Sequence, residues 1–358
     1  MMRRLLLMLT ALVLALTLAQ GVARAEPSPD GEDIEYHALR HDDIFAQIRA
    51  IQPKVYLPNP KHQYQGMNNC GPTTTVIAMS NWGVMRTQTD AVWVLKPNPK
   101  DVNVSPWEIV SYIKSQGLEA QWRVNGSLET LQLFLSNDIP VMVEQWMLDD
   151  GGMGHYRLAT GYNKERGTIT FDDSFYGPDQ RWSNEDFQAR WDEFNLNHIF
   201  IPVYPPEKAD LVRALLGPDA DDKQMWQRAE AARRADLEND PNNARVWFAL
   251  GDALLNQNRV DEALPAYEKA YTLGLPFRFY WYQFGHFETL AKLGRWQRLL
   301  QLTQPVLAKA PIHEEMFYYQ GVAYKGMGNM DAARDAFQKS AEANKNFDRT
   351  KQALKAMN

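Results

Sequence analysis

Before residue 206, hydrophobic residues occur in short runs and alternations that are typical of strands. The runs 139–145 and 198–204 each predict a strand. Segments 156–162 and 168–173 flank a turn-like stretch and predict an antiparallel hairpin. After residue 222 the composition shifts to helix formers. The pattern therefore predicts an α+β domain followed by an all-α domain.

Helix-start signals lie between the predicted strands. Ser105 and Glu108 have the spacing of a capping box, and Pro106 suits the first helical position, so we expect a helix from there to about residue 116. Ser127 and Ser183 stand at the expected starts of two further helices, which would run to residues 135 and 194. These helices complete the predicted α+β domain.

The first 25 residues have the layout of a secretory signal peptide. Arg3 and Arg4 precede an apolar run from Leu5 to Ala19, and Ala25 ends a small-x-small cleavage site. The run is short for a membrane span, although an uncleaved anchor is the alternative. We expect cleavage after Ala25, a secreted or extracytoplasmic product, and no membrane span in the mature chain.

The charge and the cysteine content limit the kinds of partner and site that the chain can have. The chain has 38 Lys and Arg against 44 Asp and Glu, and this acidic balance argues against nucleic acid as the partner. Cys70 is the only cysteine, which excludes an intramolecular disulfide and a cysteine-rich metal site. No His-Glu-x-x-His run, phosphate loop or dinucleotide fingerprint occurs. We therefore expect no metal and no other cofactor.

The neighbourhood of Cys70 is typical of a reactive thiol. Asn68 and Asn69 precede it, and a mostly apolar segment begins after Gly71. Pro72 suits the first turn of a helix, so Cys70 would lie at a helix N-terminus, where the helix dipole favours the thiolate. A lone cysteine in an exported protein is either a buried apolar residue or a thiol retained for its reactivity. The polar flank favours the second.

A cysteine nucleophile needs a base, and the base needs an orienting group. Of seven histidines, His155 stands at the head of the predicted hairpin, whose return strand ends in Asp172 and Asp173. Strand alternation places Asp173 on the apolar face with Phe171, and Asp172 on the face that is more open to solvent. Asp173 is the preferred orienting carboxylate, with Asp172 as the alternative. Arg157 would lie on the same face of its strand as His155, where it interrupts the apolar pattern.

These motifs resemble those of the C39-type cysteine peptidases, which are papain-like enzymes. The resemblance covers roughly residues 36–205 and is carried by Gln65, Asn68-Asn69-Cys70-Gly71-Pro72, Gly154-His155-Tyr156, Thr160-Gly161-Tyr162 and Asp172-Asp173-Ser174. It implies a papain-like fold with Cys70 as nucleophile, His155 as general base and Asp173 as the orienting residue. It also implies Gln65 as oxyanion-hole donor, with the backbone N–H of Cys70; Gln63 is the alternative donor.

The helical part carries a repeat of about 34 residues. Its first unit resembles the tetratricopeptide (TPR) pattern in Trp247, Leu250-Gly251, Ala263, Tyr267, Ala270 and Pro276, and further units begin near Trp281 and Phe317. The middle unit is degenerate. We expect a linker over 206–222 and a TPR solenoid over 223–358. Its aromatic residues either line a binding surface or pack between repeats, among them Tyr280, Trp281, Tyr282 and His286.

Together these features predict an exported cysteine peptidase that hydrolyses peptide bonds, with a TPR module that recruits the peptide or protein substrate or a protein partner. Two alternatives stay open. One is a non-catalytic adaptor that binds peptides through its repeats. The other is a cysteine acyltransferase or transpeptidase, which differs only in the final acceptor. The sequence carries no signal for an oligomeric state.

Overall fold

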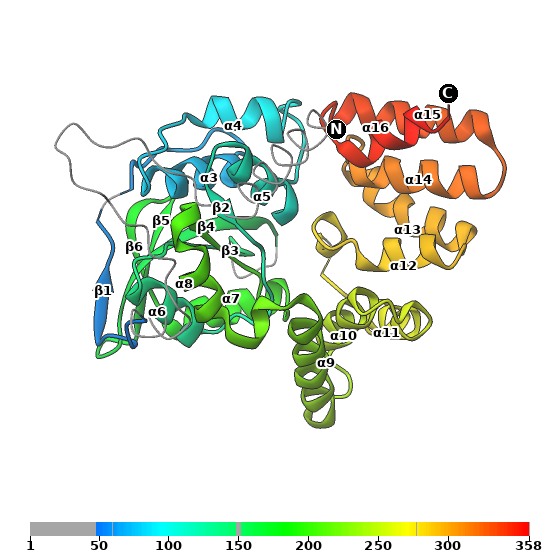
Figure 1. Cartoon of the computed structure of the whole chain (residues 1–358). Coiled ribbons are helices and arrows are strands. Elements are labelled where there is room, and N and C mark those ends of the chain that lie inside the picture. Colours follow the sequence, from blue (N-terminus) through cyan, green and yellow to red (C-terminus); the bar gives the residue numbers. More distant parts are fainter. Residues whose placement is uncertain (1–47, 59, 148–151, 277, 358) are drawn as a thin grey trace, which may run out of the picture. The chain divides into compact units, whose positions relative to one another are not determined.

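The computed structural model describes residues 48–58, 60–147, 152–276 and 278–357 (Figure 1). The expected signal peptide and its cleavage site lie outside these residues. Among the helices that are described, none is long and apolar enough to cross a membrane.

A seven-stranded sheet organises the first part of the chain. Its order is β2-β7-β3-β4-β5-β6, with β1 paired to β4, and every pairing is antiparallel. The strands are β1 (Lys54–Tyr56), β2 (Glu119–Ala120), β3 (Val141–Trp146), β4 (Gly154–Asn163), β5 (Thr168–Asp173), β6 (Gly177–Ser183) and β7 (Phe200–Tyr204). The predicted hairpin is β4–β5, in which Leu158 lies opposite Asp172.

Helices cover both faces of the sheet. One core joins Met142 and Leu158 to α3 (Cys70–Ser80), α4 (Gln88–Leu95) and α5 (Pro106–Ser115). A second core joins Val141, Val143 and Ala159 to α6 (Leu128–Ser136) and α7 (Asn184–Phe194). Because successive residues of a strand point to opposite faces, the two cores lie on opposite sides of the sheet. This explains why β3 and β4 are apolar on both faces.

The residues expected as a linker, 206–222, are instead mostly helical. They form 3-10 turns over Pro206–Lys208 and Gly217–Ala220, and between them lies α8 (Ala209–Leu216). Val212, Leu215 and Leu216 are buried in the same core as α6 and α7. Their spacing gives α8 one apolar face, which packs on the sheet domain. The segment is therefore part of that domain's core.

The second part of the chain is helical. It comprises α9 (Asp222–Asn239), α10 (Ala244–Asn256), α11 (Val260–Leu273), α12 (Gly285–Lys292), α13 (Trp296–Lys309), α14 (Glu314–Gly326), α15 (Met330–Ala343) and α16 (Asp348–Lys355) (Figure 1). The pairs α10–α11 and α14–α15 pack alike. An added Cβ would lie 2.7 Å from the Tyr267 ring at Gly251 and 2.5 Å from the Phe337 ring at Gly321. The glycine–aromatic pairs of the repeat therefore allow the paired helices to pack closely. The predicted fold class, α+β followed by all-α, is confirmed.

The degenerate middle repeat departs from a regular helix pair. A 3-10 turn over Phe279–Trp281 precedes the eight-residue α12. Tyr280, Trp281 and His286 are buried, so they pack within the array. Tyr282 packs against Trp146 at the end of β3, with ring centroids 5.9 Å apart. The middle repeat therefore shares a hydrophobic core with the sheet domain.

Candidate active site

Cys70 is the first residue of α3, and its side chain is partly exposed. The rest of the helix is buried, and it lies close to β4 because residue 71 is a glycine. A Cβ at Gly71 would lie 3.3 Å from Val104 and 3.4 Å from the Tyr156 ring. The first N–H groups of a helix have no partner within it, and the helix dipole stabilises negative charge there. The fold thus places the thiol at a position that favours a thiolate.

His155 lies on β4, is buried, and connects the thiol to an acid. Its Nε2 is 3.0 Å from Oδ1 of Asp173 at the end of β5. The ring also interacts with the Cys70 thiol, since each of these two groups shifts the pKa of the other. Since Nε2 faces Asp173, Nδ1 is the ring nitrogen that remains for the thiol. Three residues that are far apart in the sequence therefore form a continuous chain of side chains.

Asp173 is fully buried, and its carboxylate accepts several hydrogen bonds. Its Oδ2 accepts a hydrogen bond from Nε of Arg157 at 2.6 Å, and its Oδ1 accepts from the backbone N–H groups of Phe175 at 2.8 Å and Tyr176 at 3.0 Å. Burial alone would raise the pKa of Asp173, but His155, Arg157 and the Tyr176 N–H together hold that pKa well below its usual range. Asp173 is therefore a carboxylate that can stabilise an imidazolium.

The pKa values of the thiol and the imidazole move in opposite directions. Burial opposes charge on Cys70, but the hydrogen bond and charge of His155 outweigh it, and the pKa of Cys70 is lowered. Burial likewise opposes charge on His155, but its hydrogen bonds to Asp173 and Cys70 outweigh it, and the pKa of His155 is raised. Between the two pKa values the pair exists as thiolate and imidazolium, which is the reactive form of a cysteine nucleophile.

Asp172, the alternative orienting acid, is paired elsewhere. Its Oδ1 lies 2.6 Å from Nδ1 of His62. The expectation that Asp172 meets solvent is wrong: it is 2% exposed, because His62 covers it. No local sequence pattern predicted this second His–Asp pair, because its partners lie on separate segments.

The two candidate oxyanion donors differ in their contacts. The Ser174 hydroxyl donates to Oε1 of Gln65 at 2.8 Å, and the Gln65 backbone N–H donates to the Ser174 carbonyl at 2.8 Å. Because Oε1 accepts from the residue after Asp173, the Nε2 group is the side-chain donor of Gln65 that remains for a ligand. Gln63 instead bonds Arg86 and Gln88 at the start of α4. The structure thus brings Gln65, and not Gln63, to the Asp173–Ser174 corner.

The helical array contributes to the surroundings of this site. At Gly154, the residue before His155, an added Cβ would lie 2.9 Å from the Tyr282 ring. A cavity of about 460 Å³ lies nearby, lined by Trp107 and Glu144 from the sheet domain and by Tyr282 and Phe284 from the array. The array therefore closes directly against the strand that carries His155.

Comparisons with known proteins match both parts of the chain. Residues 50–197 match the family model described as Peptidase_C39 like family, and residues 215–274 and 315–347 match two tetratricopeptide repeat models. The degenerate middle repeat falls between the two repeat matches. A search of the curated proteins found no match.

Three solved structures illustrate the similarity. The peptidase domain of Streptococcus ComA, a bi-functional ABC transporter involved in quorum sensing, is 18% identical, with 41% of this chain and 99% of that chain covered and a TM-score of 0.34. A double glycine motif protease from an AMS/PCAT transporter, solved with its leader peptide, is 10% identical, with coverages of 42% and 94% and a TM-score of 0.33. YrrB, a TPR protein with an unusual peptide-binding site, is 21% identical, with coverages of 42% and 76% and a TM-score of 0.34.

Proposed function

We propose, from the premise that this chain carries a C39-like peptidase domain followed by tetratricopeptide repeats, that it is a cysteine peptidase that hydrolyses peptide bonds. The observation that carries the proposal is the connected series of Cys70, His155 and Asp173, in which the thiol pKa is lowered and the imidazole pKa is raised. A domain that only binds peptides has no need of such a pair.

The proposed reaction has two stages. The Cys70 thiolate attacks the scissile carbonyl carbon, and the oxyanion that forms is stabilised by Nε2 of Gln65 and the backbone N–H of Cys70. The His155 imidazolium then donates its proton to the leaving amine, which leaves a thioester on Cys70. Water, deprotonated by His155, attacks the thioester and releases the carboxylate product. Asp173 keeps the ring oriented and stabilises its charged form.

The TPR array is proposed to recruit the peptide or protein that is cleaved, or a protein partner. Two features support this role: the array lines the cavity beside Glu144, and Tyr282 lies against Gly154. We also propose that the protein is exported and cleaved after Ala25. Mass spectrometry of the protein from cell fractions tests this, since a cytoplasmic chain that retains residues 1–25 would contradict it.

The proposed activity is tested on the mature chain, residues 26–358, under reducing conditions. The protein is incubated with a peptide library beside its Cys70→Ala variant. Hydrolysis that disappears with Cys70→Ala supports the peptidase. Products that form only with an added amine favour the acyltransferase. Peptides that bind equally well to both proteins, with no cleavage and no thioester, favour the adaptor.

Gln65→Ala is expected to lower kcat by about 10²–10³-fold with a small effect on KM, because it removes a donor to the oxyanion. Gln63→Ala is the matched control, since this side chain only bonds the α4 N-terminus. Steady-state kinetics on a peptide identified from the library measures both. A larger loss for Gln63→Ala than for Gln65→Ala would reverse the assignment.

A further inference from the structure

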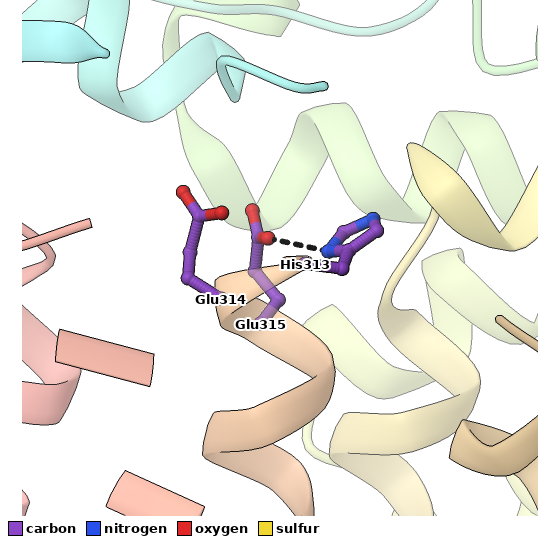
Figure 2. A group of neighbouring side chains, drawn as sticks. All are labelled: His313, Glu314 and Glu315. Carbon is purple, nitrogen blue, oxygen red and sulfur yellow. Dashed lines mark ion pairs between the residues drawn. The ribbon is translucent and has the colours of Figure 1, made fainter. Parts of the chain in front are cut away.

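A buried group of ionisable side chains lies far from Cys70 in the sequence, at the start of α14. His313, Glu314 and Glu315 are 0%, 1% and 2% exposed. Each offers a ligand atom, and the three atoms lie within 4.8 Å of one another. Figure 2 shows the two carboxylates beside each other and the ion pair between His313 and Glu315. Acidic residues in the first turn of a helix are common, but full burial of two of them is not.

A third buried acid, Asp101 of the sheet domain, is connected to this group through Asn103. Oδ1 of Asp101 accepts the backbone N–H of Asn103, whose side-chain Nδ2 donates to Oε1 of Glu315 at 3.3 Å. Asp101 is fully buried, and among the described residues its Oδ2 has no hydrogen-bond partner; the same holds for Oε2 of Glu314. A buried carboxylate oxygen without a partner is costly, and a bound cation is one way to remove that cost.

The charges around the group do not balance. Glu108 acts on Glu314 and Glu315 through its charge, so the acids that face one another number four. Lys96 is the buried lysine beside Asp101, and its Nζ donates to the carbonyl of Asn68. A divalent cation bound among these acids would offset part of their negative charge.

His313 is oriented as metal-binding histidines usually are. Its Nε2 lies 3.1 Å from the backbone carbonyl of Trp281, which makes Nε2 the protonated nitrogen. Its Nδ1 lies 2.9 Å from Oε2 of Glu315. A ring whose second N–H is held by a backbone carbonyl presents the other nitrogen to a metal in a fixed direction. Loss of the proton on Nδ1 would turn this ion pair into two ligands.

We propose that this group binds one divalent first-row transition-metal ion, with His313, Glu314 and Glu315 as ligands. One imidazole with carboxylates suits Zn²⁺ or Mn²⁺, whereas Ca²⁺ favours oxygen ligands alone. The proposal departs from the sequence expectation of no metal. It is independent of the proposed peptidase activity, because its readouts are metal binding and thermal stability.

The bound ion would fix Glu315, which accepts a hydrogen bond from Asn103 of the sheet domain. Asp101 and Asn103 belong to the segment that leads to Val104, and the Val104 carbonyl accepts the Tyr156 hydroxyl at 3.0 Å. The side chain of Val104 lies beside Gly71, next to the candidate nucleophile. Metal binding would therefore stabilise the wall of the candidate active site as well as the domain junction.

The test uses the Cys70→Ala variant of the mature chain, so that the thiol cannot bind metal. The protein is stripped with a chelator, incubated separately with Zn²⁺, Mn²⁺ and Ca²⁺, desalted and analysed for metal content. We expect one Zn²⁺ or Mn²⁺ per chain and a rise in Tm of roughly 5 °C. Less than about 0.1 Zn²⁺ or Mn²⁺ per chain would overturn the proposal, because protons would then neutralise the group.

Two substitutions locate the ion. Glu314→Gln in the same background is expected to abolish stoichiometric metal binding. It is also expected to raise the Tm of the stripped protein, because it relieves repulsion between the acids. A higher Tm together with lost binding would show that the variant is folded and lacks only the metal site. If Glu314→Gln does not fold, Glu315→Gln is used in its place. Glu268→Gln is the matched control, because it changes a His–Glu pair that Arg298 already neutralises. Binding that survives Glu314→Gln unchanged would contradict the site.

Discussion

Asp173→Ala is expected to lower kcat/KM by about 10³–10⁴-fold. The substitution removes the acceptor that holds Nε2 of His155, and it removes the charge that stabilises the imidazolium. The pKa of His155 should fall, and that of Cys70 should rise because less imidazolium faces it. In a plot of kcat/KM against pH, the acidic limb should therefore move to higher pH and the alkaline limb to lower pH. Kinetics between pH 5 and 10 measures this.

Asp173→Asn separates orientation from charge. Two backbone N–H groups fix an acceptor at the Oδ1 position, so the amide oxygen can still receive His155, while the amide N–H₂ faces Nε of Arg157. We expect a smaller loss of activity than for Asp173→Ala, with the alkaline limb still moved to lower pH. Asp172→Ala is the second control, and it should leave the profile unchanged. If Asp172→Ala removes activity and Asp173→Ala does not, the orienting acid is misassigned.

Arg157→Leu is expected to lower the free energy of unfolding by about 3–5 kcal/mol. Arg157 is fully buried, and its guanidinium forms a buried ion pair with Asp173; it also stacks over the Trp182 ring at 4.3 Å. Removing it leaves a buried carboxylate with less compensation. Arg190→Leu is the matched control, because Arg190 stacks on the same ring at 4.4 Å. Urea denaturation should give a loss of about 1 kcal/mol or less for this control.

Arg157→Leu also has a kinetic signature. The charge of Arg157 lowers the pKa of His155, so its loss should raise that pKa and move the alkaline limb of the profile to higher pH. This direction is opposite to that of Asp173→Ala. Equal stabilities for the parent, Arg157→Leu and Arg190→Leu would show that the buried pair does not hold the site together.

Local patterns predicted the parts of the site that depend on one segment. The β4–β5 hairpin follows from the alternation around residue 165, and the α3 start follows from Cys70 and Pro72. Arg157 was visible only as an interruption of a strand pattern, because its partner Asp173 is chosen by strand pairing. His62 lies on a segment without regular structure, so its contact with Asp172 had no local signal.

Features that depend on contacts between distant segments could not be predicted from local sequence patterns either. His313, Glu314 and Glu315 resemble the acidic start of an ordinary helix, and only the folded chain brings Asn103 to Glu315. The spacing of Val212, Leu215 and Leu216 did signal an apolar helix face where a linker was expected. The shift in composition at residue 222 marked the start of the repeats, but the sheet-domain core extends almost to that point.

The central claim is that Cys70 is a thiolate paired with His155, and a single cysteine makes this directly measurable. The rate of alkylation of the native chain by iodoacetamide is followed against pH, beside His155→Ala. We predict a rate that is already near its plateau at pH values well below about 8.5, the ordinary thiol pKa, and a shift of the curve to higher pH in His155→Ala. A native thiol that titrates near or above 8.5, with the same curve in His155→Ala, would contradict the account.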